Sequence, residues 1–120
     1  MIRRGARAAM YLRCYPDDIW QMSCHHDALL QLASREGLSP PAVFRDIGCR
    51  SRDPRPALDQ LLALAGNSYQ VVLVPGPFVF SIYDDEARAV VARLKAAGCG
   101  VLELPSRFRR GRGGARTRRQ

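Results

Sequence analysis

The sequence contains almost no lysine, no long apolar run and no closely spaced pair of cysteines. Lysine supplies one of its 19 basic residues, and arginine supplies all the others. No apolar stretch approaches the roughly 20 residues that cross a bilayer. The basic residues 1–4 are followed by no apolar segment of the kind found in secretion signals. We therefore expect a cytoplasmic protein with neither a membrane span nor a secretion signal.

Four cysteines are dispersed along the chain: Cys14, Cys24, Cys49 and Cys99. Without a secretion signal, such cysteines are expected to stay reduced. A zinc site would have to recruit Cys24 together with His25 and His26, with Cys49 as a further candidate ligand. Neighbouring residues on a helix point in different directions, and the sequence has no Cys-x-x-Cys pair. The pattern favours dispersed thiols, and we predict neither a metal site nor a cofactor.

The positive charge is concentrated at one end of the chain. The net charge of the 120 residues is +8, yet residues 107–120 carry seven arginines and no acid, which leaves 12 basic and 11 acidic groups elsewhere. This segment has little to bury, so we expect residues 106–120 to form a disordered Arg/Gly-rich tail. The alternative is a general arginine bias of the sequence without a selected role. The predicted nucleic-acid-binding residues, which would contact phosphates weakly and without sequence preference, are Arg107, Arg109, Arg110, Arg112, Arg116, Arg118 and Arg119.

Short apolar segments alternate with amphipathic ones. The apolar segments predict strands at 6–14, 42–45, 69–74 and 101–104. Between them we expect helices at 19–35, from Pro56 to the Gly66-Asn67 stop, and at 84–97. The run 69–74 is apolar almost throughout, which is typical of a parallel strand buried on both faces.

This alternation predicts an α/β fold. We expect a three-layer α/β/α domain over residues 1–105, with a mainly parallel four-stranded sheet. Ligands of such sheets bind beyond the carboxyl ends of the strands. Those ends are residues 13–17, 46–55 and 75–83.

Several motifs follow one another in a recognisable order over residues 6–104. They are Tyr11-Leu12-Arg13-Cys14-Tyr15, Arg35-Glu36-Gly37, Asp46-Ile47-Gly48-Cys49-Arg50-Ser51, Arg55-Pro56-Ala57-Leu58-Asp59-Gln60-Leu61-Leu62 and Ala97-Gly98-Cys99-Gly100-Val101-Leu102. In order and spacing they resemble the catalytic domain of resolvase/invertase-type serine recombinases. Active members of this family carry out site-specific recombination of DNA, and the resemblance implies a link to that process.

The resemblance also shows where the family's chemistry is missing. The family attacks a DNA phosphodiester with a serine, and Tyr15 occupies the serine position. Arg13 and Arg55 match two active-site arginines. The family's Asp-Arg-Leu-Ser-Arg segment aligns with Phe78-Val79-Phe80-Ser81-Ile82, so four of six expected catalytic positions are replaced. Each lost donor to a transition-state oxyanion costs ~10²–10³ in rate. We expect a protein that no longer exchanges strands.

Other interpretations of these residues stay open. Arg13 and Arg55 could bind a phosphate or could be solvated remnants. A tyrosine nucleophile at position 15 is disfavoured, because its hydroxyl lies about 6.5 Å from Cα against about 2.4 Å for serine. We expect Ser51 and Ser81 to be turn residues and not nucleophiles.

The replaced segment is itself informative. Residues 75–80 are apolar and aromatic where the family is charged, so they either pack inward or form a contact surface for a protein partner. The family continues into a dimerisation helix and a DNA-reading helix-turn-helix, whereas this sequence ends about 15 residues after its fourth strand. We expect neither sequence-specific DNA reading nor the usual dimer. The first hypothesis is thus an inactive, DNA-associated resolvase-like domain; the alternative is a protein-interaction module that uses the Pro75–Phe80 loop.

Overall fold

The computed structural model describes residues 4–14, 19–50 and 53–105, so Tyr15, Ser51 and the predicted tail lie outside the described residues. Strands and helices alternate along the chain. The elements are β1 (Ala8–Cys14), α1 (Ile19–Arg35), β2 (Ala42–Ile47), α2 (Pro56–Leu64), β3 (Val71–Val74), the 3₁₀ turn η1 (Pro77–Val79), α3 (Asp84–Ala96) and β4 (Gly100–Glu103).

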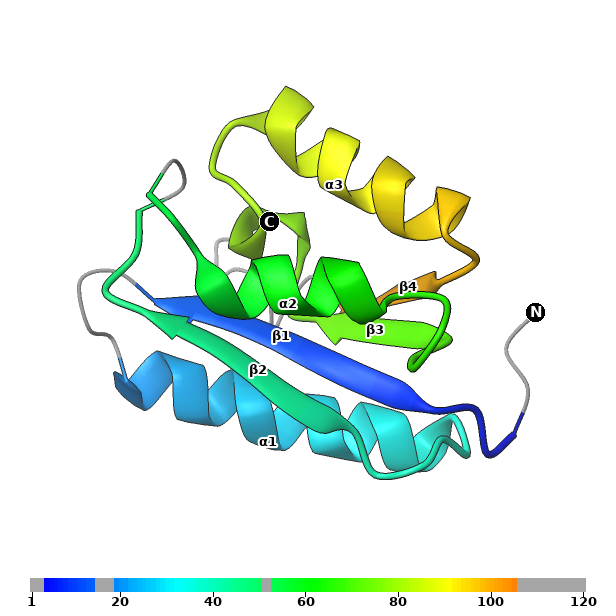
Figure 1. Ribbon diagram of the computed structural model, residues 1–120. Coiled ribbons are helices and arrows are strands. Elements are labelled where there is room, and N and C mark those ends of the chain that lie inside the picture. The colour runs from blue at the N-terminus through cyan, green and yellow to red at the C-terminus, as the bar shows by residue number, and fades with distance from the viewer. Residues whose placement is uncertain (1–3, 15–18, 51–52, 106–120) are drawn as a thin grey trace.

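The four strands form one parallel sheet in the order β2-β1-β3-β4. Helix α1 covers one face of the sheet, and α2 and α3 lie over the other (Figure 1). The predicted α/β fold with a parallel sheet is therefore confirmed. Connections between parallel strands are right-handed. The chain moves from β1 to β2 in one direction along the sheet and from β2 to β3 in the other, so α1 and α2 lie on opposite faces.

Alternating side chains of the central strands build two separate cores. Met10 and Leu12 of β1 pack toward α1, where they meet Leu29. Tyr11, between them, points to the opposite face and packs with Leu61 of α2. Strand β3 is buried at every position, as its apolar run predicted. Full burial of each such leucine contributes about 1.5–3 kcal/mol, so both layers of helices are held firmly to the sheet.

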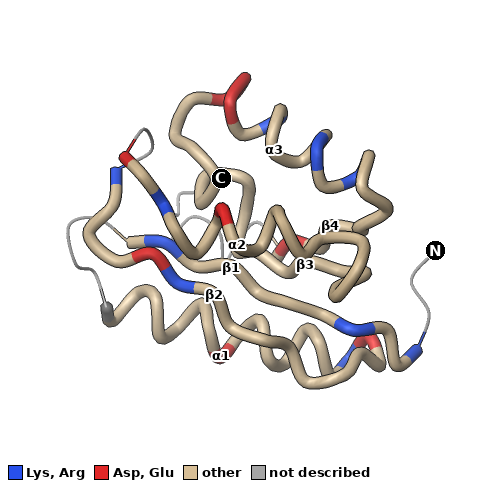
Figure 2. The backbone as a smooth tube through the Cα atoms, in the orientation of Figure 1, with Lys and Arg blue, Asp and Glu red and all other residues tan. Residues whose placement is uncertain are grey.

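Charge is arranged along α3 in the sense that stabilises a helix. Asp84, Asp85 and Glu86 occupy its first turn, and Arg93 and Lys95 its last. Figure 2 shows the acidic front and the basic remainder of this helix. Negative charge near the amino end and positive charge near the carboxyl end both interact favourably with the helix macrodipole. The predicted acidic start of this helix is confirmed.

Several details differ from the sequence predictions. Strands β1 and β3 each begin two residues later than predicted, and β4 begins and ends one residue earlier. Strand β2 extends to Ile47, two residues beyond the predicted end, because it stays paired with β1 as far as Cys14. The turn η1 was not predicted; it is held by a 2.9 Å hydrogen bond from the Phe80 amide to the Pro77 carbonyl. A single turn is too short to leave a periodic pattern in a sequence.

No described helix is both long and apolar enough to cross a membrane.

Candidate functional site

The carboxyl ends of β1, β2 and β3 bring together the segments that the sequence marked as a site. Arg13 lies near the end of β1, and Arg55 directly precedes α2. Both side chains reach the same stretch of backbone, residues 78–80, which follows β3. The structure therefore places the two retained arginines in one cluster, although they are 42 positions apart in the sequence.

The Arg13 guanidinium donates three hydrogen bonds to backbone carbonyls. Its Nε donates to Val79 at 3.0 Å, its Nη2 to Phe78 at 3.1 Å, and its Nη1 to Cys49 at 3.0 Å. These bonds tie the end of β1 to the loops after β2 and β3. Arg13 thus acts as a brace among three segments.

The Arg55 guanidinium joins the same cluster from the other side. Its Nη1 donates to the carbonyls of Val79, at 3.3 Å, and Phe80. Burial, followed by the nearby charge of Arg55, lowers the pKa of Arg13. Within the described segments, no carboxylate forms an ion pair with either guanidinium. Among the described residues, the two guanidinium groups thus share backbone carbonyls as their acceptors.

Beside the arginines, a buried carboxylate organises the start of α2. Asp46 accepts hydrogen bonds from the backbone amides of Ala57 and Leu58, both at 3.0 Å, and from the Tyr11 hydroxyl at 2.8 Å. Burial and the neighbouring Asp46 carboxylate raise the pKa of Tyr11 far above its usual range. The Tyr11 ring also stacks on Phe80, with centroids 5.9 Å apart. Asp46 is therefore the helix cap that α2 lacks in its own Arg55 side chain.

Sequence reasoning matched Asp46 to a family motif but assigned it no role. A local cap would precede the helix by one residue, whereas Asp46 acts from a strand end 10 residues before Pro56. The signal that could have found it is an acid at a strand's carboxyl end ahead of an Arg-Pro helix start. Only the hydrogen bonds from the Ala57 and Leu58 amides show that this acid reaches the helix.

The segment after β3 packs mostly inward. Val79 and Phe80 are buried, which confirms the inward-packing interpretation for these two residues. Phe78 is 37% exposed and lies against the His25 ring, with centroids 6.2 Å apart. Ile82 is 71% exposed. The apolar residues of this segment therefore divide between core and surface.

Ser81 has a structural role. Its hydroxyl donates to Glu86 Oε1 at 2.9 Å and accepts from the Tyr83 amide at 3.0 Å. These bonds shape the entry into α3, so the turn role predicted for Ser81 is confirmed. The same prediction for Ser51, and the nucleophile position Tyr15, fall outside the described residues.

The candidate zinc ligands do not converge. Cys24 is exposed whereas His25 is buried, as expected for adjacent residues of a helix. Within the described segments, no three side chains of the metal-binding types lie close enough to share an ion.

No protein-family model and no curated protein sequence matches this chain. Solved structures do. The C-terminal catalytic domain of ISC1926 TnpA, an IS607-like serine recombinase, aligns over 83% of this chain and 69% of its own, with a TM-score of 0.71 and 19% identity. The N-terminal catalytic domain of TP901-1 integrase aligns over 82% and 76%, with a TM-score of 0.71 and 19% identity. A resolvase family site-specific recombinase from Streptococcus pneumoniae aligns over 82% and 71%, with a TM-score of 0.70 and 10% identity. The chain therefore has the fold of the serine recombinase catalytic domain, as its motifs predicted.

Proposed function

We propose that this protein associates with DNA but does not exchange DNA strands. The observation that carries the proposal is the engagement of both retained arginines by the backbone of residues 78–80. A guanidinium that stabilises a phosphoryl transition state must present its donors to the phosphate oxygens. Here Arg13 directs its Nε, Nη1 and Nη2, and Arg55 directs its Nη1, at carbonyls of the chain itself.

The remaining positions support the same conclusion. Transfer of a phosphoryl group needs a nucleophile and donors placed around the phosphorus, and the sequence offers Tyr15, Phe78, Val79 and Ile82 at four of those places. Each missing donor costs ~10²–10³ in rate. Even with non-additive effects, strand cleavage falls below detection.

Association with DNA is attributed to residues 107–119. They carry seven arginines, whereas the rest of the chain is nearly neutral. Binding of this kind weakens with salt, because each neutralised phosphate releases counterions, with a slope of about −0.9 in log affinity against log salt. We expect weak binding to duplexes of any sequence.

The test is fluorescence anisotropy with a random-sequence duplex over a series of salt concentrations. One variant replaces all seven arginines of residues 107–119 by glutamine, and a second carries Arg55→Gln in the otherwise intact chain. Binding should be lost in the first variant and kept in the second. Undiminished binding by the first variant would contradict the role of the tail. Nicking of supercoiled plasmid by the intact chain, abolished by Tyr15→Phe, would overturn the proposed inactivity.

A second candidate function is a protein-interaction module that uses the Pro75–Phe80 loop. The exposure of Phe78 favours it, since aromatic side chains at a surface are enriched in interfaces. A Phe78→Asp variant should lose a partner that Ile82→Asp still captures, because Ile82 is exposed outside this loop. Equal capture by both variants, or an unfolded Phe78→Asp protein, would remove the support for this function.

A further inference from the structure

One face of the edge strand β2 is left uncovered by the helices. The register pairs Val43, Arg45 and Ile47 with β1 residues that point toward α1. However, α1 packs chiefly over β1 and β3. Val43 is therefore 38% exposed and Ile47 51% exposed, and Arg45 between them is exposed as well.

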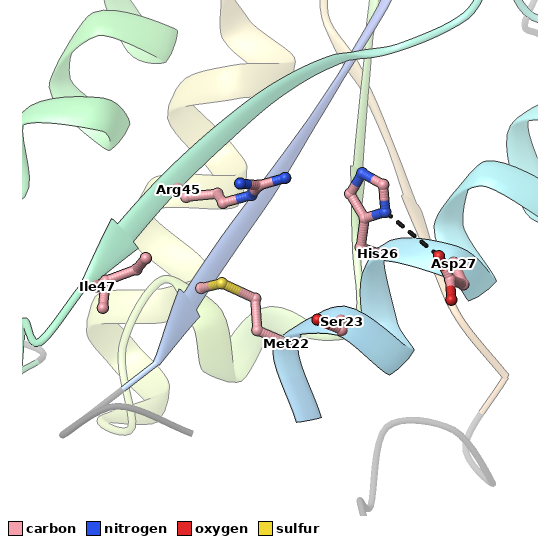
Figure 3. Close-up of a pocket in the computed structure, with 6 residues that line it drawn as sticks. All are labelled: Met22, Ser23, His26, Asp27, Arg45 and Ile47. Carbon is pink, nitrogen blue, oxygen red and sulfur yellow. Dashed lines mark hydrogen bonds and ion pairs between the residues drawn. The ribbon is translucent and has the colours of Figure 1, made fainter. Parts of the chain in front are cut away.

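Helix α1 supplies the opposite wall of a groove along this strand. Met22, His26 and Leu30 are spaced by four residues, so they share one side of the helix. Leu30 is 40% exposed. Figure 3 shows a pocket of about 180 Å³ between this helix and the strand, lined by Met22, Ser23, His26, Asp27, Arg45 and Ile47. The lining combines the apolar side chains of Met22 and Ile47 with the charged side chains of Asp27 and Arg45.

The outer edge of β2 also has free backbone groups. The strand order places β1 on one side of β2 and no strand on the other. In the described part of the chain, no backbone hydrogen bond from outside the sheet reaches residues 43–46. An unpaired edge of this kind presents alternate N–H and C=O groups to any extended chain that lies beside it.

The charge at the centre of the groove has no acidic partner. Arg45 pairs with β1 through its backbone, but across residues 4–14, 19–50 and 53–105 its side chain takes part in no hydrogen bond and no ion pair. The nearby Asp27 pairs at 3.5 Å with His26. Arg45 lies between the apolar side chains of Val43 and Ile47 on this face of β2. A peptide with an acidic side chain between two apolar ones would be complementary to it.

From these observations we propose that the β2 edge and the α1–β2 groove bind an extended peptide by strand addition. Main-chain hydrogen bonds to β2 would supply affinity, and alternate side chains lying in the groove would supply specificity. The groove fits a strand whose inward residues run apolar, acidic, apolar, so that the acid meets Arg45 and its neighbours meet Val43 and Ile47. This interaction is separate from the proposed association with DNA, and none of the residues that line the pocket belongs to the loop that contains Phe78.

The experiment uses the full chain and a capped nine-residue peptide of alternating valine and threonine, with glutamate in place of the central valine. Binding is followed by NMR shifts of the backbone amides. A second peptide carries lysine in place of the glutamate, and a third has N-methylated threonines that cannot pair with a strand. The variants are Arg45→Glu and, as a matched control, Arg93→Glu, which removes an exposed arginine of α3 on the other side of the sheet.

The glutamate peptide should shift amides of β2 and should bind at least tenfold more weakly to Arg45→Glu than to the unaltered chain. The lysine peptide should regain that loss on Arg45→Glu, and Arg93→Glu should change nothing. Unchanged binding by Arg45→Glu, shifts that avoid β2, or equal binding of the N-methylated peptide would each overturn the proposal.

Two other uses of this edge give different results. If β2 pairs with β2 of a second copy, sedimentation will show a dimer that Arg45→Glu alters, and the peptide will not bind. If Arg45 only protects the edge from aggregation, Arg45→Val will aggregate and again no peptide will bind. Either result contradicts recognition of a peptide. Circular dichroism melts of each variant verify that the compared proteins are folded.

Discussion

Tyr11 and Asp46 form a buried hydrogen bond of 2.8 Å between adjacent strands, and the same carboxylate holds the first amides of α2. The pair therefore couples the centre of the sheet to the helix that begins beside Arg55. Tyr11 and Asp46 thereby fix the start of α2, and with it the backbone that carries Arg55.

Removal of the Tyr11 hydroxyl should weaken the fold without disturbing its shape. Tyr11→Phe keeps the ring stacked on Phe80 but deletes a hydrogen bond to a charged acceptor, which is worth about 1.5–3 kcal/mol. Asp46→Ala should cost more, because it leaves the hydroxyl and two helix amides without their acceptor. Urea denaturation measures both changes. Equal losses for the two variants would contradict the capping role of Asp46.

Stability should fall in strong alkali. The pKa of Tyr11 is raised in the folded state above its usual value of about 10. Below pH 10 the hydroxyl is protonated in both states, so its contribution is complete. Above about pH 10 the unfolded state loses this proton first, and the free energy of unfolding declines by up to about 1.4 kcal/mol per pH unit.

The comparison with Tyr11→Phe isolates this effect. Burial also raises the pKa of the Cys99 thiol, which adds a decline that begins near its ordinary value of 9.0. A Cys99→Ala background removes that contribution. In this background the tyrosine protein should lose stability between pH 10 and 11 more steeply than Tyr11→Phe. Parallel curves would show that Tyr11 ionises equally easily in both states.

The arginine cluster should be sensitive to geometry as well as to charge. Arg13→Lys keeps the charge but cannot serve three carbonyls in different directions, since only the guanidinium offers a planar set of donors. We expect it to lose about 1–3 kcal/mol of stability, with increased hydrogen exchange at residues 78–80. Arg88→Lys is the control, because Arg88 forms an exposed pair with Asp84 at 2.7 Å. A similar small effect for both variants would mean that Arg13 is no brace.

Substitutions at two glycines with positive φ should distinguish the cost of backbone strain from the cost of a steric clash. Gly66 has a φ of +85°, and an added Cβ would lie 2.1 Å from the Ala97 carbonyl oxygen. Gly98 has a φ of +90° and open space around it. Gly98→Ala should cost only the backbone term of about 1–2 kcal/mol. Gly66→Ala should cost clearly more, because α2 and α3 must move apart at their carboxyl ends. Thermal melts of both variants give the comparison.

Local patterns in the sequence were enough to predict most of the architecture. The helix at 19–35 matches α1, and Pro56 marks the first residue of α2, because helix periodicity and a proline at a helix start are properties of neighbouring residues. The unbroken apolar run before Pro75 matched a fully buried β3 for the same reason. The order of these elements, with the motifs around Arg13 and Arg55, also led to the recombinase fold.

The candidate site depended on distances that no local pattern contains. The sequence placed Arg13 and Arg55 at strand ends but left open whether they faced a phosphate or solvent. In the structure they face carbonyls of residues 78–80, a third possibility that requires the turn η1. Likewise, the exposure of Phe78 beside the buried Val79 and Phe80 follows from that turn and not from their shared apolar character.

The sequence by itself determined the elements and their alternation into a parallel α/β fold, because these follow from residue identity and near-neighbour spacing. Only the tertiary structure decided that Asp46 caps α2, that two arginines hold one loop, and that β2 keeps an uncovered face beside α1. The physical reason is that hydrogen bonds and burial depend on which atoms the fold brings within about 3–4 Å, and those atoms come from distant parts of the chain.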